Sequence, residues 1–323
     1  MDVTIVIPTK NAGILLDRVL EAVFNQKTSY KYEVICVDSG SSDNTLDIIA
    51  KYPVKLYQIP ASEFGHGKTR NFGASKGSGD YIVFITQDAL PASDVWLQNF
   101  IDAMKLDPDI AGGFGIHYPY PDCNIIDKRD LKSHFEGFGT DNTIFQLTDK
   151  ERYEQDEGYR QFLAFFSDNN SCLRRDIWEK YPYEDVEFAE DQKWARKIVE
   201  LGYKKVYCPY APVYHSHNYD LHSYLGRYFD ETKGLCLIHD RVGVQHWFYV
   251  LPAIIKHSLI DRRYFKSLGI SKKERKDAEK YSLKRNYARY MGAYLGCKYY
   301  NYPHWLQVYL DKHISQQYEQ RSK

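Results

Sequence analysis

The sequence has 323 residues and is 43% hydrophobic, which suits one large globular domain or two ordinary ones. Its 43 Lys and Arg residues balance its 43 Asp and Glu residues, so bulk charge argues against a nucleic-acid partner. The six cysteines are scattered and form no Cys-x-x-Cys pair, which favours reduced thiols in a cytosolic protein over a disulfide framework or a structural zinc. The nearest candidate for a membrane span, residues 247–255, is shorter than the roughly 18 apolar residues required.

Buried strands alternate with helices through the first third of the chain. The predicted strands cover residues 3–8, 32–38, 54–59 and 81–85. The predicted helices cover residues 11–25, 45–49, 69–76 and 94–105. Because apolar strands separated by helices are typical of a parallel sheet covered on both faces, the fold class is α/β, with a Rossmann-like, doubly wound, mostly parallel sheet.

The alternation continues less regularly up to about residue 220. Strands are predicted at residues 111–118, 169–174 and 204–209, and helices at residues 175–180 and 191–201. The polar region 119–161 is expected to be an irregular, flexible loop near the site. Beyond the boundary at 220, residues 221–323 are predicted to form a helical, Tyr-rich region.

Charge is distributed unevenly along the chain. From Lys256 to the last residue there are 16 Lys and Arg but 6 Asp and Glu, whereas the preceding part has 27 and 37. A basic C-terminal region on an acidic body indicates an anionic partner surface, either a membrane or a polymer. A solvated helical face explains the same charges equally well.

Polar side chains stand where predicted parallel strands end, which is where such sheets bind ligands. Asp38 could accept hydrogen bonds from a ribose or a base, or could cap a turn, and Thr9 would line the same pocket. Asp88 follows the apolar strand 81–85 and could hold Mg²⁺ or Mn²⁺ against a diphosphate. The alternative role for Asp88, as the cap of the next helix, is also open to Asp94.

Three further segments could contribute to a site. The loop at residues 66–71 offers Lys68 and Arg70, and Arg70 could grip phosphate or order Asp88, although a plain basic loop explains it too. Glu190 and Asp191 open a helix, where one could deprotonate an acceptor hydroxyl, although the helix dipole alone favours acids there.

His215 and His217 form the third segment. They alternate on an extended stretch of chain, so they are expected to point to opposite sides. At most one of them would then face a given metal ion. For either histidine taken singly, an ordinary surface or core position explains it as well.

Four segments, taken in order, resemble the inverting family 2 glycosyltransferases, which have the GT-A fold. They are residues 3–11 (VTIVIPTKN), 38–45 (DSGSSDNT), 86–88 (TQD) and 190–191 (ED), and the likeness covers roughly residues 3–217. The loop 64–71 (FGHGKTRN) together with residues 86–89 (TQDA) is similar to bacterial rhamnosyltransferases that use dTDP-β-L-rhamnose to build surface polysaccharides.

The resemblance implies a role for each matching residue. Nucleotide and donor binding would belong to Thr9, Asp38, Ser39, His66, Lys68, Arg70 and Gln87. Asp191 would be the general base, with Glu190 beside it. Asp88 would be the surviving acid of the DxD motif, and His215 or His217 would complete a site for Mg²⁺ or Mn²⁺. The acceptor side would be lined by the polar run 167–171 (SDNNS), with Asn169, Asn170 and Ser171 as the candidate contacts.

The chain departs from the family pattern at Thr86, where the first acid of the DxD motif is expected. The implied reaction is one displacement that inverts the anomeric centre, with a lipid-linked glycan as acceptor at the cytoplasmic face of the membrane. The basic C-terminal region would contact that membrane, and an oligomer is possible. The alternatives are a UDP-hexose donor with the same mechanism, a non-catalytic nucleotide-sugar-binding scaffold, and a nucleotidyltransferase, for which residues 9–13 are a poor phosphate loop.

Overall fold

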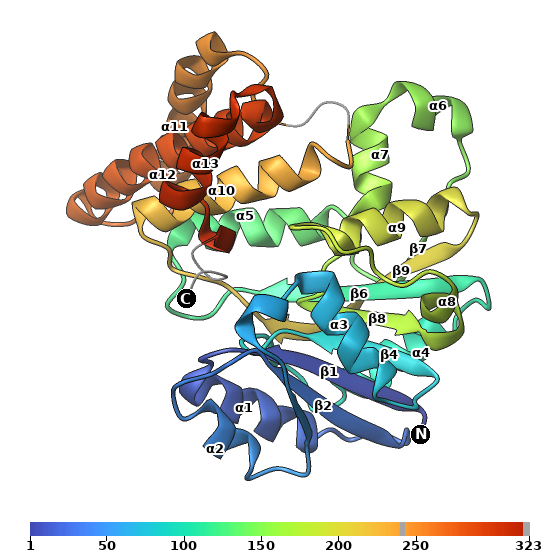
Figure 1. The fold of residues 1–323 in the computed structure, drawn as a ribbon. Coiled ribbons are helices and arrows are strands. Elements are labelled where there is room, and N and C mark those ends of the chain that lie inside the picture. Colours follow the sequence, from blue (N-terminus) through green and yellow to red (C-terminus); the bar gives the residue numbers. More distant parts are fainter. Residues whose placement is uncertain (240–242, 319–323) are drawn as a thin grey trace. The chain divides into compact units, whose positions relative to one another are not determined.

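The computed structural model describes residues 1–239 and 243–318. One nine-stranded sheet runs through it in the order β3-β2-β1-β4-β8-β6-β9-β5, and β7 pairs with β9 (Figure 1). The strands are β1 (Val3–Thr9), β2 (Tyr32–Asp38), β3 (Lys55–Gln58), β4 (Tyr81–Ile85), β5 (Leu90–Pro91), β6 (Ile110–Tyr118), β7 (Thr143–Phe145), β8 (Asn170–Arg174) and β9 (Lys204–Tyr214).

The sheet is mostly parallel, as the sequence predicted. β3, β2, β1 and β4 run in one direction, β8 is antiparallel to both β4 and β6, and β9 is parallel to β6. β1, β2, β4, β6 and β9 therefore all finish at the same end of the sheet, where β8 begins. We call this the carboxyl end, and it gathers residues from five loops.

Helices cover both faces of the sheet because successive strand residues point to opposite sides. On one face, Ile5 and Ile7 pack with α1 (Gly13–Phe24), α2 (Thr45–Ile49) and α4 (Trp96–Met104). On the other face, Val6 and Phe84 pack with α3 (His66–Ser75), α8 (Arg175–Lys180) and α9 (Glu190–Glu200). In α1, Leu16, Val19, Leu20 and Val23 are fully buried, each stabilising the fold by roughly 1.5–3 kcal/mol.

The prediction of an irregular loop over residues 119–161 is wrong. The region contains α5 (Ile125–Glu136), β7, α6 (Lys150–Gln155) and, running just past it, α7 (Glu157–Ala164). Two caps set the short helices: the Asp149 carboxylate accepts from the Arg152 N–H, and the Asp156 carboxylate accepts from the Tyr159 N–H. The polar surfaces of these helices hid their apolar periodicity, but the two Asp residues were a usable signal for where each helix begins.

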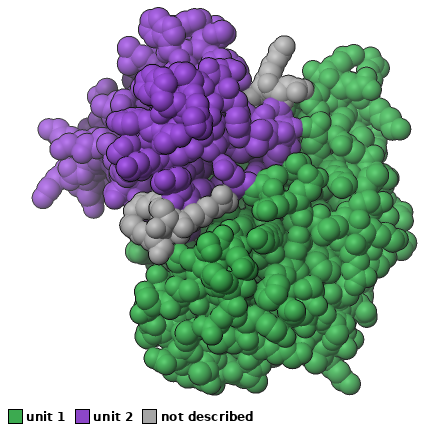
Figure 2. Space-filling model, viewed as in Figure 1, with its two compact units in different colours: residues 1–123, 128–186, 190–216 green, residues 124–127, 187–189, 217–323 purple. Residues whose placement is uncertain are grey.

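The chain forms two compact units, drawn in different colours in Figure 2. Unit 1 comprises residues 1–123, 128–186 and 190–216, and it holds the sheet. Unit 2 comprises residues 124–127, 187–189 and 217–323.

Unit 2 is helical. Its main helices are α10 (Leu221–Leu235), α11 (Val250–Ser267), α12 (Lys272–Lys298) and α13 (His304–His313), with 3₁₀ turns η2 (Trp247–Tyr249) and η3 (Tyr299–Asn301); unit 1 has one at η1 (Ala61–Glu63). A Cβ at Gly292 would lie 2.5 Å from the Leu225 carbonyl oxygen, so α10 and α12 need glycine to pack this closely. In the described ranges, no helix has the length and apolar character needed to cross a membrane.

Candidate active site

The loops that follow β1 and β2 are bound together at the carboxyl end of the sheet. The Asn11 N–H donates to the Ser41 hydroxyl at 2.8 Å, and the Asn11 side-chain oxygen accepts from the Ser42 N–H at 2.8 Å. The Gly13 N–H donates to the Asp43 carboxylate at 3.1 Å. Asn11 and Gly13 both have positive φ, of 47° and 55°, so the turn after β1 is shaped to meet the second loop.

Asp38 lies fully buried inside this pair of loops, with Thr9 and Ser39 also buried. The Gly40 and Ser41 N–H groups donate to one Asp38 oxygen at 3.1 and 2.9 Å, and the hydroxyls of Thr9 and Ser41 donate to the other. Four donors therefore occupy the carboxylate that was expected to bind a ribose or a base. In this structure Asp38 caps the turn, which was the alternative interpretation.

Gln87 has a similar role on the other side of β1. Its side-chain oxygen accepts from the Lys10 N–H at 2.8 Å, and its amide donates to the Lys10 carbonyl at 3.1 Å. This two-way bond fixes the loop after β1 against the loop after β4. Gln87 thus shapes the turn after β1 through Lys10, and its direct contact with a sugar donor stays a prediction.

The helix α3 begins at His66, so residues 66–71, predicted as a loop, form its first turns. His66 is half-buried and Lys68 is exposed at its first turn. A Cβ at Gly67 would lie 2.9 Å from the Glu184 carbonyl oxygen and 3.3 Å from the Glu190 Cβ, so only glycine fits there. The absence of a side chain at Gly67 brings the first turn of α3 against the segment that carries Glu190.

Arg70 differs from its expected position. Its guanidinium is only 6% exposed and forms ion pairs with the Glu190 carboxylate at 2.8 Å and with the Asp168 carboxylate at 3.3 Å. It also donates to the His66 carbonyl at 3.2 Å. A guanidinium held by two buried carboxylates is not placed to grip a diphosphate or to order Asp88.

Asp168 completes a buried acid cluster, which we define as Arg70, Asp168, Tyr183, Glu190 and Asp191. Asp168 accepts from the Tyr183 hydroxyl at 2.7 Å, and its own N–H donates to the Asp191 carboxylate at 3.2 Å. The Gln192 N–H donates to the other Asp191 oxygen at 2.7 Å. Sequence reasoning placed Asp168 only in a polar run on the acceptor side, and nothing in the spacing signals its pairing with Arg70.

The cluster contains three carboxylates for one guanidinium, and the pKa values of Glu190 and Asp191 are raised within it. Burial raises the pKa of Asp191 well above its ordinary value, the nearby Glu190 and Asp168 raise it further, and Arg70 opposes this. Burial likewise raises the pKa of Glu190 to about 7 against the attraction of Arg70. Asp191, which is partly exposed, is therefore a stronger base than a solvated carboxylate when it is ionised.

Two of the three residues expected on the acceptor side are fully buried. Asn170 accepts from the Trp96 indole N–H at 3.0 Å and donates to the Ala211 carbonyl at 2.8 Å, so it is part of the core. Ser171 is buried and donates to Asp168 at 2.6 Å. Both lie on β8, an inner strand of the sheet that pairs with β4 on one edge and with β6 on the other. The assignment of acceptor contacts to these two is wrong, whereas Asn169 is half-buried at the start of the strand.

Asp88 lies beyond the end of β4 and close to His215. The His215 Nε2 and Asp88 Oδ1 atoms are 3.6 Å apart. The His215 N–H donates to the Tyr118 carbonyl at 2.9 Å, and the Tyr120 hydroxyl donates to the Asp88 carbonyl at 3.0 Å. The end of β6 thus positions both side chains.

The expected strand alternation does not extend to the two histidines. β9 ends at Tyr214, and no strand includes His215 or His217. Strand alternation therefore does not apply to these histidines, and the prediction that they point to opposite sides loses its basis. His217 opens unit 2, and its part in any metal site stays a prediction.

A carboxylate and an imidazole at this separation fit two ligands of one divalent ion. The Thr86 hydroxyl, at the position of the missing acid, is buried without a hydrogen-bond partner in the described ranges. The Tyr120 hydroxyl bond fixes the backbone of Asp88, and the bond from the His215 N–H fixes the backbone of His215. Both side chains therefore extend from an ordered backbone. The donor set of Asp88 and His215 is thus suited to a metal ion.

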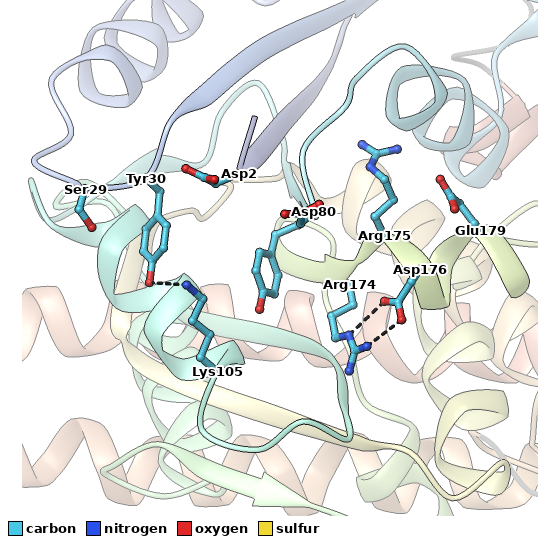
Figure 3. Close-up of a pocket in the computed structure, with 10 residues that line it drawn as sticks. Asp2, Ser29, Tyr30, Asp80, Lys105, Arg174, Arg175, Asp176 and Glu179 are labelled. Atoms are coloured by element: carbon cyan, nitrogen blue, oxygen red, sulfur yellow. Dashed lines mark hydrogen bonds and ion pairs between the residues drawn. The ribbon is translucent and has the colours of Figure 1, made fainter.

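A hollow of about 730 Å³ lies at the opposite end of the sheet (Figure 3). Tyr81 and Arg174 line it, at the start of β4 and the end of β8. In the close-up, Arg174 and Asp176 face one another, and their ion pair is 2.7 Å long. The chemistry-bearing residues are all at the carboxyl end, so we do not assign the active site to this hollow.

Comparison with known proteins identifies the family. Residues 4–181 match Glycosyl transferase family 2. The O-antigen chain rhamnosyltransferase RfbN of Salmonella typhimurium is 34% identical over 237 residues, which are 71% of this chain and 71% of that protein. The O-antigen chain rhamnosyltransferase WbaN of Salmonella anatum is 33% identical over 233 residues, covering 70% of each.

A solved structure supports the same fold. The mannosyltransferase PcManGT from Pyrobaculum calidifontis, in complex with GDP-Man and Mn²⁺, matches with a TM-score of 0.54 at 18% identity, covering 98% of this chain and 81% of that one. At that identity the likeness shows the fold alone. The predicted family and fold are confirmed: the chain belongs to glycosyl transferase family 2 and is a glycosyltransferase with the GT-A fold.

Proposed function

We propose that this glycosyltransferase moves L-rhamnose from dTDP-β-L-rhamnose to a hydroxyl of a lipid-linked glycan during cell-surface polysaccharide synthesis. The observation that carries the proposal is that the Asp88–His215 pair and the acid cluster lie together at the carboxyl end of the unit 1 sheet. Ile85, at the end of β4, pairs with Asn170, so the loop with Asp88 and the segment with Asp168 are neighbours. The rhamnose donor is supported by the names of the two Salmonella relatives.

Asp191 is the proposed general base. Two backbone N–H groups, from Asp168 and Gln192, fix its carboxylate at the start of α9. In the reaction it takes the proton of the acceptor hydroxyl as the oxygen attacks the anomeric carbon. Its raised pKa brings its basicity nearer to neutral pH, which is the range in which a general base is effective.

Donor binding is proposed at the loops after β1 and β2 and at the first turn of α3. Lys68 is exposed there, and with His66 it can meet the negative charge of a diphosphate. Asp38 and Gln87 hold these loops in shape, and the turn after β1, where Lys10 is half-buried, is proposed to face the nucleotide.

Asp88 and His215 are proposed to hold Mg²⁺ or Mn²⁺, and His217, two residues further on, is the alternative to His215 as the second ligand. A bound divalent ion would offset the negative charge that grows on the departing diphosphate. The chain itself supplies two side chains and an ordered backbone for this role, so most of the remaining ligands would have to be donor oxygens and waters.

The stereochemical outcome follows from a single base. The acceptor oxygen attacks on the face opposite to the leaving nucleotide, so a β-linked donor gives an α-linked product. A diphosphate leaves without a strong acid, so one carboxylate suffices where glycosidases need two. Asn169, half-buried before β8, is the remaining candidate for an acceptor contact. We further propose action at the cytoplasmic face of the membrane, with residues 221–323 as a separate helical region.

A donor screen tests the proposal. Purified protein with Mn²⁺ is incubated in turn with dTDP-rhamnose, UDP-glucose, UDP-N-acetylglucosamine and UDP-galactose, and the released nucleotide diphosphate is measured. We expect turnover of dTDP-rhamnose above all others. Turnover of a UDP-sugar without dTDP-rhamnose turnover would replace the donor and keep the mechanism. No turnover of any donor, with binding retained, would instead favour a nucleotide-sugar-binding scaffold.

A further inference from the structure

Unit 2 carries a row of exposed apolar side chains along η2 and α11. Trp247, Leu251, Ile255 and Leu259 recur every four residues, which places them on one stripe of the helix. Their exposed fractions are 72%, 64%, 51% and 50%. Phe248 adds a second large ring at the same end, 50% exposed. We call these five residues the α11 ridge.

The ridge is not needed for the core of unit 2. Another side of α11 buries Val250, Ile254 and Phe265. On that side Asp261 accepts from the Ser282 hydroxyl at 2.6 Å and from the Asn286 amide at 3.0 Å, which fastens α11 to α12. The helix is therefore already anchored, and a large exposed apolar surface on an anchored helix usually marks an interaction site.

Charges beside the ridge select the kind of partner. Lys256, Arg263 and Lys266 on α11 are all exposed, and the only acid of the helix, Asp261, is buried. A second copy that docked through the same stripe would bring these cations face to face. A surface that is apolar inside and anionic outside meets both features, and a bilayer containing anionic lipid has that character.

We propose that the α11 ridge docks onto an anionic lipid bilayer, with Trp247 and Phe248 at the headgroup boundary and the lysines and arginines against lipid phosphates. The helix would lie in the interface and not cross it, since α11 has only 18 residues and four of them are Lys or Arg. This surface would hold a cytoplasmic-face enzyme close to a lipid-linked substrate. It stands on exposure and charge alone, so it does not depend on the identity of the donor sugar.

Vesicle flotation of the full chain tests the ridge, without donor or acceptor present. Wild-type protein is mixed with phosphatidylcholine vesicles or with vesicles that also contain phosphatidylglycerol. We expect flotation with the anionic vesicles and weaker flotation at high salt. The variant Leu251→Gln/Ile255→Gln should bind the anionic vesicles at least about tenfold more weakly, because two exposed aliphatic side chains lose their contact with the bilayer.

A matched control separates the ridge from general stickiness. Leu106 and Leu201 of unit 1 are 55% and 49% exposed, and Leu106→Gln/Leu201→Gln should float as the wild type does. Equal losses in the two double variants, or no flotation of the wild type, would overturn the proposal. So would a dimer in sedimentation velocity that Leu251→Gln/Ile255→Gln dissolves, because the occupant would then be a second copy.

Discussion

Two groups of polar side chains at the carboxyl end of unit 1 look alike in sequence and behave differently in structure. In the donor loops, Asp38 and Gln87 are fully engaged with backbone N–H and carbonyl groups. In the acid cluster, three carboxylates compete for Arg70, and negative charge is left in excess. The first group fixes the shape of the loops, and in the second burial and the excess of carboxylates raise the pKa of Asp191, the proposed base.

Removing the one cation should have the largest effect on this difference. Arg70→Met leaves Asp168 and Glu190 without their buried partner, and breaking such a pair typically lowers the free energy of unfolding by about 3–5 kcal/mol. Urea unfolding at neutral pH measures the loss. Arg174→Met removes a more exposed ion pair with Asp176 and should cost no more than about 1 kcal/mol. Equal losses for the two variants would show that Arg70 does not stabilise the cluster.

Asp88→Asn should affect chemistry more than folding. The change keeps the shape of the side chain but weakens a proposed metal ligand, so we expect kcat to fall on the order of 10²–10³-fold. Titration of the rate with Mn²⁺, followed for each variant, checks this. The matched change Asp94→Asn, at a residue 55% exposed and paired with Lys27, should leave the rate and its metal dependence intact. An unchanged Mn²⁺ response in Asp88→Asn would remove Asp88 from the metal site.

pH should act in opposite directions on activity and on stability. The base works only when ionised, so the transfer rate should rise as pH rises through the raised pKa of Asp191. Burial raises the pKa of Glu190 from an ordinary 4.5 to about 7, so its contribution to stability is present below pH 4.5 and is lost as pH rises through 7. Rate profiles and urea unfolding over the same pH range compare the two.

A neutral substitution sharpens the pH prediction. Glu190→Gln removes one of the carboxylates that raise the pKa of Asp191, so the rise in rate should move to lower pH. The exposed Glu179→Gln should leave the profile in place. If both profiles coincide with that of the wild type, the acid cluster does not set the ionisation of the base.

The smallest effect is expected in the donor loops. Gln87→Ala removes two hydrogen bonds to Lys10, each stabilising the loop by about 0.5–1.5 kcal/mol, so the donor KM should rise roughly three- to tenfold with little change in kcat. Gln98→Ala, which loosens contacts at residues 28 and 29 instead, is the control. A fall in kcat without a change in KM would place Gln87 in the chemistry and not in the loop.

The sequence predicts the order of strands and helices in this molecule better than the partners of its polar side chains. Apolar runs at β1, β2 and β4, separated by amphipathic helices, indicated the parallel sheet, and strand ends pointed to Asp88. Region 119–161 was missed because α5, although 12 residues long, is mostly polar, and because α6 and α7 are short helices that begin at Asp149 and Asp156.

The direction of a side chain was harder to predict than its place in the chain. Arg70 lies 120 residues from Glu190 in sequence, and no local pattern signals their ion pair. Asn170 and Ser171 follow the half-buried Asn169, but they lie on an inner strand and their side chains bond to other buried groups of the core. Polar residues at a strand end can therefore be located from sequence, while their partners depend on how distant segments pack.

The assignment of Asp191 as the general base is tested by measuring acceptor-dependent transfer in Asp191→Asn. The rate of rhamnose transfer from dTDP-rhamnose to a lipid-linked glycan is compared among wild type, Asp191→Asn and the exposed control Asp109→Asn. We expect a loss of at least about 10²-fold for Asp191→Asn, with donor binding retained and the control unaffected. A rate for Asp191→Asn within a few-fold of wild type would contradict the assignment of the base and, with it, the function proposed for the acid cluster.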